Sequence, residues 1–381
     1  MSRFLFIVPP LTGHINPTVS VAHALIASGH RVAWVGHASR VRPLLPPEAE
    51  LLALDELDLT ALEQRSRAVR GLESLQFLWE DVLIPLAHVM RPGVLRAIAS
   101  WAPDVAVVDH QALAGAVAAT ETGVRWATFC TTSASVVDAL AALPKVKAWV
   151  EAQVHGLFAS AGLATASPES PSLVVVFSTR ALVGHDLAFP AHYRFVGPAT
   201  VARPDATPFP WERLSDALPR VFVSLGTVNA ESGAPFYAAA VEALGDLRVI
   251  LAAPPALVPS PPAHWIVQPR VPQLALLPHV SAVVCHGGHN TTCEALAHGL
   301  PLVLTPIRDD QPLVTQQVVR AGAGLRVRFG RVAPGSLREA VLQVLTEPSF
   351  REAARRLQSS FAEAGGAQAA AQALITLGDG S

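Results

Sequence analysis

Short apolar runs alternate along the chain with longer stretches at helical spacing. In the N-terminal half the runs are rich in β-branched or aromatic residues, as is typical of buried strands. The expected strands of this half are Phe4–Val8, Arg31–Val35, Val105–Val108, Trp126–Cys130, Val174–Ser178 and Tyr193–Val196. The expected helical regions between them are Thr18–Ser28, Leu57–Ala99, Ala112–Thr122 and Ser133–Ala161. Such alternation predicts parallel strands joined by helices.

A segment rich in proline, alanine and aspartate interrupts this pattern, and we interpret residues 200–218 as an interdomain linker. Alternation then resumes with strands expected near Arg220–Thr227, Arg248–Leu251, Trp265–Val267, Ser281–Cys285, Leu302–Thr305 and Gly324–Val327. Helices are expected at Thr291–His298, Ser336–Thr346, Ser349–Ala364 and Ala367–Leu377. The prediction is an α/β protein of two doubly wound, Rossmann-like domains facing across a cleft. Their bounds are 1–199 and 219–381, and the last helix is in a position to pack back on the first domain.

Composition supports this picture and excludes several classes of partner. The length of 381 residues suits two domains, and a chain with 51% hydrophobic and 15% charged residues suits sheets covered on both faces. A formal net charge of -2 gives no reason to expect nucleic-acid binding. No apolar run approaches transmembrane length and the N-terminus lacks signal-peptide features, so we expect no stable membrane insertion. Three cysteines form no disulfide framework, which favours a cytoplasmic protein.

Polar residues gather where two strands of the second half end. The turn His286–Asn290, which contains Gly287 and Gly288, follows one strand and precedes a helix, and Asp310-Gln311 follows the next strand. Glycines allow close approach of the backbone, and a helix N-terminus favours a phosphate or diphosphate. The pair Asp310-Gln311 is placed to hold hydroxyls, so the stretch predicts a nucleotide-sugar pocket. A G-x-G-x-x-G fingerprint after the first strand and a P-loop motif are both absent from the sequence.

Six motifs in the same order resemble family 1 glycosyltransferases, the nucleotide-sugar-dependent enzymes of plants and bacteria with the GT-B fold. They are Gly13-His14-x-Asn16-Pro17, Phe195-Val196-Gly197-Pro198, Ser224-Leu225-Gly226-Thr227, Val271-Pro272-Gln273, His286-Gly287-Gly288-x-Asn290-Thr291-x-x-Glu294 and Pro306-x-x-x-Asp310-Gln311. Within the family the chain looks most like the bacterial macrolide and antibiotic transferases. The likeness spans nearly the whole chain.

The resemblance implies metal-independent, inverting transfer of a hexose, with glucose favoured, from a UDP-sugar or dTDP-sugar to a hydroxyl of a hydrophobic natural product. His14 would be the general base and Asp109 its supporting carboxylate, which suits an imidazole of pKa about 6.5. Glu294 would hold the ribose, and Asp310 with Gln311 the sugar. The donor-binding residues implied are Thr227, Arg270, Val271, Gln273, His286, Gly288, Asn290, Thr291, Glu294, Asp310 and Gln311. The donor sugar is a co-substrate, so neither cofactor nor metal is expected.

One position departs from the family pattern and leaves the donor base open. Arg270 stands where a tryptophan often stacks on the base, although a guanidinium can stack as well. Trp265 is assigned to the core.

Several residues have a second interpretation. Asp109 could cap the helix ahead of Ala112, and Asp104 or Asp138 could replace it beside His14. Thr291 and Glu294 also fit a capping box. Cys285, His286, His289 and Cys293 suggest a zinc site, but their spacing matches no common pattern. Six large side chains are core by default, and some could line an acceptor pocket: Phe77, Trp79, Met90, Phe129, Trp149 and Phe158.

Two rival functions share the fold. The first is a catalytically silent helper that binds a nucleotide sugar, and the second is a nucleotide-sugar 2-epimerase. The presence of His14, Asp109, His286 and Asn290 argues against the helper, and the Gly13–Pro17 motif argues against the epimerase. The sequence carries no signal for the acceptor's identity or for oligomeric state; the acceptor atom is left open among O, N, S and C, with oxygen favoured by the His–Asp pair.

Overall fold

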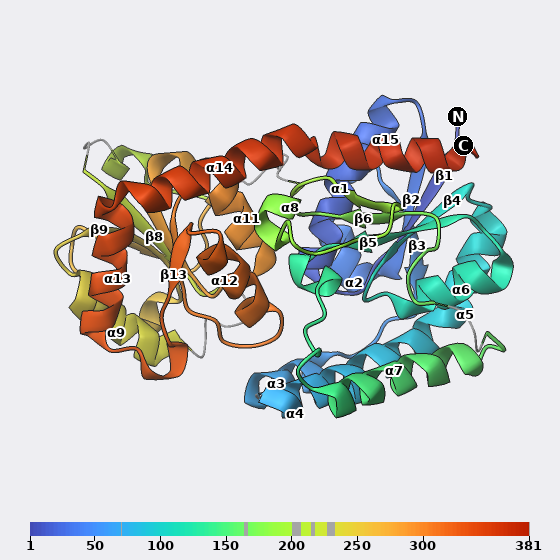
Figure 1. Ribbon diagram of the computed structural model, residues 1–381, viewed down its shortest axis with the longest axis horizontal. Helices are drawn as coiled ribbons and strands as arrows, with labels where there is room; N and C mark the ends of the chain where they lie inside the picture. The colour runs from blue at the N-terminus through green and yellow to red at the C-terminus, as the bar shows by residue number, and fades with distance from the viewer. Residues whose placement is uncertain (70, 164–166, 200–206, 215–217, 227–232, 381) are drawn as a thin grey trace. The chain divides into compact units, whose positions relative to one another are not determined.

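A computed structural model describes residues 1–69, 71–163, 167–199, 207–214, 218–226 and 233–380. The chain forms two compact units (Figure 1). The first consists of Met1–Thr179, His185–Thr200 and Ala364–Ser381, and the second of Arg180–Gly184 and Val201–Glu363.

The first unit is built on a seven-stranded parallel sheet. In sheet order its strands are β3 (Glu50–Leu54), β2 (Arg31–His37), β1 (Arg3–Ile7), β4 (Val105–Asp109), β5 (Trp126–Cys130), β6 (Val174–Val176) and β7 (Tyr193–Phe195). Its helices are α1 (Thr12–Ala27), α2 (Ala38–Val41), α3 (Thr60–Ala68), α4 (Gly71–Phe77), α5 (Ile84–Trp101), α6 (Leu113–Thr122), α7 (Pro144–Ala159) and α15 (Gly366–Gly378). The order changes direction at β1, whose neighbours are β2 and β4. In a doubly wound sheet, ligands bind at this point, beyond the carboxyl ends of the strands.

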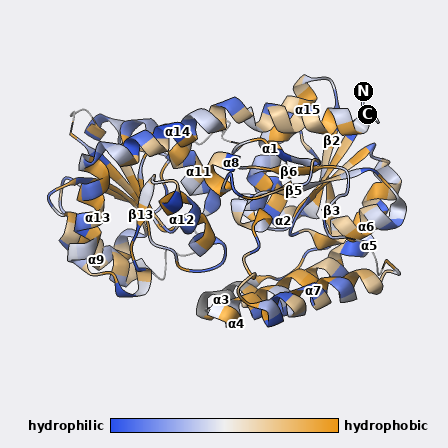
Figure 2. Cartoon of the chain, in the orientation of Figure 1, coloured by the Kyte–Doolittle hydropathy of each residue, from blue (hydrophilic) through white to orange (hydrophobic). Residues whose placement is uncertain are grey.

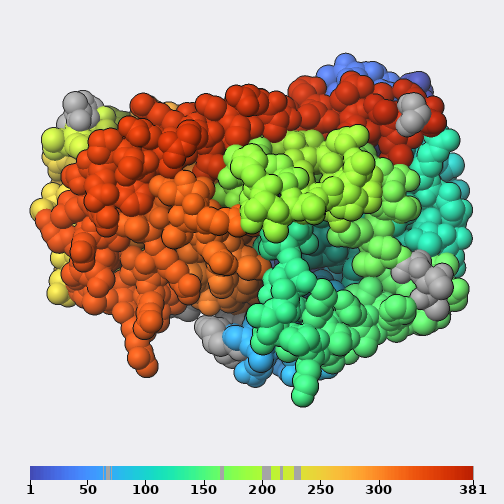
Figure 3. Space-filling model, in the orientation of Figure 1, coloured from blue at the N-terminus to red at the C-terminus, as the bar shows by residue number. Residues whose placement is uncertain are grey.

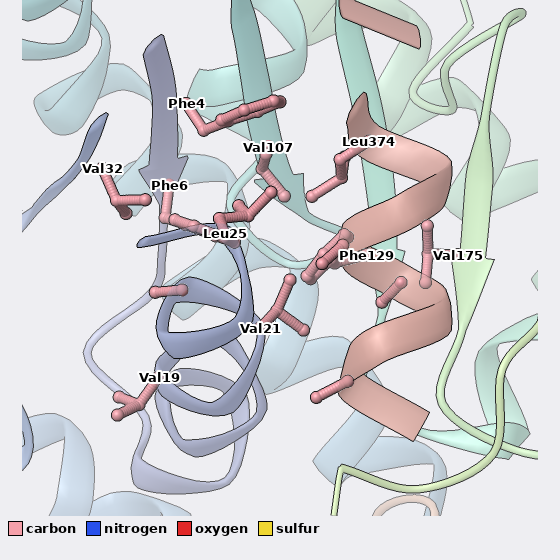
Figure 4. Packing of buried hydrophobic residues seen from close by; sticks show 14 of the residues in the cluster. Phe4, Phe6, Val19, Val21, Leu25, Val32, Val107, Phe129, Val175 and Leu374 are labelled. Atoms are coloured by element: carbon pink, nitrogen blue, oxygen red, sulfur yellow. The ribbon is translucent and has the colours of Figure 1, made fainter. Parts of the chain in front are cut away.

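Both faces of this sheet are apolar. Successive side chains of β1 point to opposite faces, and Phe4–Ile7 are all apolar. Phe4 and Phe6 pack with α1 and α15, whereas Leu5 and Ile7 pack with α5 and α6. Figure 4 shows the first of these cores, where side chains from α1, the strands and α15 meet around Phe129.

The second unit repeats the architecture with six parallel strands. In sheet order they are β10 (Ile266–Gln268), β9 (Arg248–Ala252), β8 (Arg220–Ser224), β11 (Ala282–Cys285), β12 (Leu302–Leu304) and β13 (Gly324–Arg326). The helices are α8 (Arg180–Val183), α9 (Ala234–Leu244), α10 (Gln273–Leu276), α11 (His289–Ala297), α12 (Gln311–Arg320), α13 (Pro334–Thr346) and α14 (Pro348–Ala364). Figure 2 shows hydrophobic strands inside each unit and hydrophilic residues on the outer sides of the helices. The prediction of two parallel-sheet, Rossmann-like domains is confirmed.

The C-terminal helix belongs to the first unit. Ala370, Ala371 and Leu374 of α15 are buried in its core, and Arg125 donates a hydrogen bond of 2.9 Å to the carbonyl oxygen of Gly378. Figure 3 shows the red C-terminal residues beside the blue N-terminal ones on the surface of this unit. The chain therefore leaves the first unit for the second and returns to finish the first.

Three details of the sequence-based prediction are corrected. Strand β3 was not predicted, since its residues Glu50–Leu54 include none with a β-branched side chain. The region 133–161 is not one helix: residues 137–143 separate the short turn Ser133–Val136 from α7, which has Pro144 at its first position. Helix α1 begins at Thr12 rather than Thr18 and contains Pro17. The fixed φ of proline fits a helix, and its missing N–H removes a single hydrogen bond.

The expectation that the chain lacks a helix of membrane-spanning length is also corrected. Gly71–Trp101 is long and apolar enough to cross a membrane by length and composition alone, and 39% of its apolar window is buried within the protein. Met90, Val94 and Ile98 of this helix pack in the core of the first unit. Core helices pass the same test of length and composition, so the finding carries little weight for a membrane.

Candidate active site and donor site

Three neighbouring strands of the first sheet end in polar residues that meet. His14 lies in the first turn of α1, after β1, while Asp109 ends β4 and Thr131 follows β5. The order β1-β4-β5 brings the carboxyl ends of these strands side by side. Each strand therefore delivers one side chain to the same place.

The imidazole of His14 is held through one of its nitrogens. Nδ1 lies 3.0 Å from both Oδ1 and Oδ2 of Asp109, and 2.8 Å from Oγ1 of Thr131. The His14 side chain is 16% exposed, whereas that of Asp109 is fully buried. Acceptor oxygens around Nδ1 favour the tautomer with its proton there, which leaves Nε2 as the nitrogen able to take a proton. The predicted pair of His14 and Asp109 is thus formed within one unit.

The carboxylate of Asp109 is kept ionised despite its burial. Burial by itself raises the pKa of this carboxyl, but His14, His110 and hydrogen bonds from His14 and the backbone N–H of Gln111 lower it, and the net pKa is below its usual value. Gln111 donates to Oδ1 at 2.8 Å, and Thr131 donates to Oδ2 at 2.9 Å. An ionised partner stabilises the imidazolium that forms when His14 takes a proton.

The alternative interpretations of Asp109 and of its rivals are resolved by these contacts. Asp109 closes the turn ahead of α6 through Gln111, but it is not the N-cap of that helix, which is Ala112. Asp104 instead accepts from the backbone N–H of Arg3, and Asp138 pairs with Lys147 at 2.6 Å. Both carboxylates are therefore engaged away from His14.

Two residues beside the pair were given no role in the sequence analysis. Thr131 is one, and His110 is the other, with a ring centroid 5.2 Å from that of His14 and an Nδ1 atom 3.7 Å from Asp109 Oδ1. A threonine that follows a strand is common, so only the strand order could have singled Thr131 out. His110 follows Asp109 directly, and this adjacency was the one available signal.

His14, Asp109 and His110 also form the one cluster, within the described ranges, of three or more metal-type ligand side chains whose atoms lie within 4.8 Å of one another. Both carboxylate oxygens of Asp109 already accept hydrogen bonds from His14, Gln111 or Thr131. A metal ion would have to replace these donors. The set therefore fits a hydrogen-bonded base better than a metal centre.

The large side chains considered for an acceptor pocket are mostly core. Phe77, Met90, Phe129 and Phe158 are at most 5% exposed. Trp79 is partly buried against the same core, and Trp149 on α7 is half-buried. Trp79 and Trp149 are accordingly the members of this set with surface left to offer a ligand.

In the second unit, the described residues among the predicted donor set follow the carboxyl ends of β10, β11 and β12. The turn after β11 wraps around His286: an atom added as Cβ on Gly226 or Gly288 would lie 2.8 Å or 2.4 Å from its ring. Gly287 has φ +80°, a left-handed conformation that glycine adopts without strain. Glycine is therefore required at Gly226 and Gly288, on the two sides of the imidazole. With no side chain at these positions, the backbone can approach a ligand closely.

His286 is a neutral side chain at physiological pH. Its burial lowers the pKa to about 4, against an opposing effect of Asp310. Its Nδ1 atom is buried and has no hydrogen-bond partner among the described residues. A buried, unsatisfied polar atom is costly, so a ligand or a water molecule at this position would be stabilising.

Glu294 is positioned differently from a capping residue. Helix α11 begins at His289, with Gly288 as its N-cap, so Thr291 and Glu294 do not form the capping box considered above. Glu294 is 7% exposed and accepts a hydrogen bond of 2.5 Å from Nε2 of Gln273. Two predicted donor residues from different motifs are thus joined.

Gln311 is oriented by its own loop. Its Oε1 atom accepts hydrogen bonds from the backbone N–H groups of Ile307 (2.8 Å) and Arg308 (3.1 Å), which leaves only its NH₂ group to face a ligand. Asp310 is the half-buried N-cap of α12, and Asp309 is an exposed turn residue with φ +55°. The predicted pair Asp310-Gln311 therefore combines a carboxylate with an amide donor.

The remaining predicted donor residues are spread around these groups. Arg270 is exposed after β10, Val271 packs partly against the core, and Asn290 and Thr291 are half-buried in the first turn of α11. Thr227 lies outside the described residues. The zinc interpretation is not supported, because Cys285 and Cys293 are both buried in the core and, among the described residues, they form no metal-type cluster with His286 and His289.

Comparisons with known proteins agree with this geometry. Residues 250–377 match the model of the erythromycin biosynthesis protein CIII-like C-terminal domain. The chain is 26% identical to 4'-demethylrebeccamycin synthase of Lentzea aerocolonigenes, over 95% of this chain and 96% of that protein. It is 27% identical to the NDP-glycosyltransferase YjiC of Bacillus licheniformis, over 95% and 94% respectively.

Solved structures extend the likeness to the fold of the whole chain. The glycosyltransferase VinC in complex with dTDP is 21% identical, with a TM-score of 0.76 over 100% of both chains. The two compact units of this chain, the matched C-terminal domain and the near-full-length relatives agree. The chain is therefore a glycosyltransferase with the GT-B fold, similar to enzymes of antibiotic biosynthesis, and its residues 250–377 match the EryCIII-like C-terminal domain.

Proposed function

We propose that this glycosyltransferase transfers a hexose, with glucose favoured, from a UDP-sugar or dTDP-sugar to a hydroxyl of a hydrophobic natural product, with inversion at the anomeric carbon. The observation that carries the proposal is the imidazole of His14, held through Nδ1 by a buried, ionised carboxylate. This is the arrangement of a general base. It has little use in a protein that only binds nucleotide sugars.

The proposed step is a single displacement. Nε2 of His14 takes the proton of the acceptor hydroxyl while its oxygen attacks the anomeric carbon. The bond between that carbon and the diphosphate oxygen breaks, and the nucleoside diphosphate leaves with the bonding electrons. Asp109 stabilises the imidazolium that results, because its carboxylate contacts the same ring at 3.0 Å.

On the donor side, His286 and the amides near Gly288 would receive the diphosphate. A neutral His286 acts as a hydrogen-bond donor there, and an anion beside it would raise its pKa from about 4. Glu294, oriented by Gln273, would accept hydrogen bonds from the ribose hydroxyls. Asp310 would accept from sugar hydroxyls, whereas the fixed amide of Gln311 would donate to them.

The nucleobase of the donor is the part of the proposal on which the fewest residues bear. The structure of VinC contains dTDP, and Arg270 of this chain offers an exposed guanidinium at the position where a base would stack. Calorimetric titration with UDP, dTDP, UDP-glucose and NAD, with and without EDTA, tests this part. We expect UDP or dTDP to bind regardless of EDTA, and lack of binding by both would refute the donor assignment.

Transfer itself is tested with His14→Ala and a matched control, His23→Ala, an exposed histidine on the same helix. With a panel of hydrophobic hydroxylated acceptors, we expect His14→Ala to abolish transfer and to bind UDP like the wild type, and His23→Ala to remain active. Equal loss of UDP binding in His14→Ala would contradict the role of a base. The anomeric proton coupling of the product reports whether the configuration inverts.

A further inference from the structure

The hydroxyl of Thr131 makes its two hydrogen bonds to the two members of the proposed catalytic pair. Oγ1 lies 2.8 Å from His14 Nδ1 and 2.9 Å from Asp109 Oδ2, and the residue is 3% exposed. Thr131 follows β5, whose residue Phe129 is in register with Asp109 of β4. The third strand in this row thus contributes a side chain to the same cluster.

The protons of this cluster can be assigned one by one. A threonine hydroxyl has one hydrogen to donate, and an ionised carboxylate can only accept. The hydroxyl hydrogen therefore goes to Asp109, and Thr131 has only lone pairs to offer His14. Nδ1 must then carry a hydrogen of its own, which it shares between Thr131 and Asp109.

Asp109 alone would hold the ring less firmly. Its two oxygens are both 3.0 Å from Nδ1, so the carboxylate presents a symmetrical pair of acceptors. Thr131 adds a third and closer oxygen from a different strand. The ring is then fixed from two directions, and the hydroxyl also donates to Asp109 Oδ2, whereas the backbone N–H of Gln111 donates to Oδ1.

We propose that Thr131 is a positioning residue of the transfer reaction, which fixes the tautomer and the orientation of His14 together with Asp109. The inference rests on the proposed function of His14 as the base. In this role Thr131 exchanges no proton with the substrate. It acts through the imidazole.

The direct test is Thr131→Val, which replaces the hydroxyl by a methyl group of similar size. We expect kcat to fall about tenfold, as for loss of a hydrogen bond to charged groups, with the Kd of UDP unchanged. Thr131→Ser retains the hydroxyl and should restore most of the activity. In an Asp109→Asn background, Thr131→Val should add little, because the two residues act on the same ring.

A matched control is Thr128→Val, the same change on strand β5, which Thr131 follows. Thr128 is fully buried and accepts a hydrogen bond of 2.8 Å from the backbone N–H of Ser170, so its loss should lower the melting temperature and leave kcat unchanged. Wild-type kcat in Thr131→Val, failure of serine to restore activity, or full additivity with Asp109→Asn would each overturn the proposal.

Nitrogen-15 NMR of the histidine rings separates this proposal from the proposed function. The wild-type protein should show an Nδ1–H tautomer for His14 with a hydrogen-bonded proton, and Thr131→Val should show faster exchange of that proton. This measurement needs no substrate, so it tests Thr131 even if the wild type fails to transfer any sugar. An unchanged His14 signal in Thr131→Val would refute the positioning role.

Discussion

Replacing Gly288 by alanine should disturb the donor site without straining the φ angle of residue 288. The φ of Gly288 is −63°, which any residue adopts, so the substitution introduces no backbone strain. Its new Cβ would lie 2.4 Å from Nε2 of His286. The imidazole must move, but on its other side the Cβ position of Gly226 is only 2.8 Å from the ring. The methyl group therefore forces the ring out of its place.

The magnitude follows from the overlap. Normal contact between such atoms begins near 3.4 Å, so the ring or the turn has to shift by roughly 1 Å, and overpacking of this kind costs about 1–3 kcal/mol. If the ring shift weakens the hydrogen bond that His286 makes to a bound diphosphate, the same energy corresponds to about a 10- to 100-fold rise in Kd. Alanine is also a poorer N-cap than glycine, so α11 loses up to about 1 kcal/mol in addition.

Calorimetric titration with UDP and dTDP measures this effect, and thermal melting reports whether the fold is kept. Gly335→Ala is the matched control, since a Cβ there has no atom within 4 Å and Gly335 is the second residue of α13 in the same unit. We expect the control to bind nucleotide like the wild type. Wild-type affinity in Gly288→Ala at an unchanged melting temperature would refute the assignment of His286 to the diphosphate.

Three further substitutions or conditions give distinct outcomes. Asp109→Asn should lower kcat about 100-fold or more with UDP affinity unchanged in calorimetry, because general-base catalysis contributes roughly 10²–10⁴-fold. The pKa of Asp109 is lowered in the folded protein from 3.8, so its contribution to stability exists above that pH and is lost as the pH falls through the lowered value; the melting-temperature difference between wild type and Asp109→Asn should shrink in acid. Glu294→Ala removes the partner of Gln273 and should raise the donor KM about tenfold in steady-state kinetics, with little change in kcat at saturating donor. EDTA should leave the transfer rate unchanged, and a loss restored by Zn²⁺ or Mg²⁺ would instead favour a metal at His14, Asp109 and His110.

The strands were the most predictable part of the fold. Runs such as Val105–Val108 and Trp126–Cys130 are apolar on both sides, as strands buried between two layers of helices must be, and both appear as strands in the structure. Strand β3 was missed because Glu50–Leu54 lies at the edge of the sheet and has a composition equally suited to a helix. The strand prediction therefore failed at an edge strand, where burial restricts the choice of amino acids least.

Helix starts were harder, and they decided the interpretation of individual site residues. Pro17 suggested a loop that ends at Thr18, yet α1 begins at Thr12, and so His14 stands on a helical turn rather than in a loop. The same kind of shift at His289 removes Glu294 from a capping box and brings it to Gln273. A change of a few residues in a helix start changes which side chains hold the N-cap and third helical positions that a capping box needs.

Strand order explains why the pair of His14 and Asp109 was predictable while their neighbour Thr131 was not. Each of the three residues follows or ends a parallel strand, and the sequence marks all such positions equally. The chain passes through β1, β4 and β5 in that order, but the amino-acid sequence does not state which strands are neighbours in the sheet. Pairing between strands far apart in the sequence leaves no local signal. A motif could single out His14 and an acidic residue could single out Asp109, but a threonine gains its meaning only when β5 is known to lie beside β4. The position of the Thr131 hydroxyl between the imidazole of His14 and the carboxylate of Asp109 is thus a property of the fold. The Thr131→Val substitution tests whether the transfer reaction depends on it.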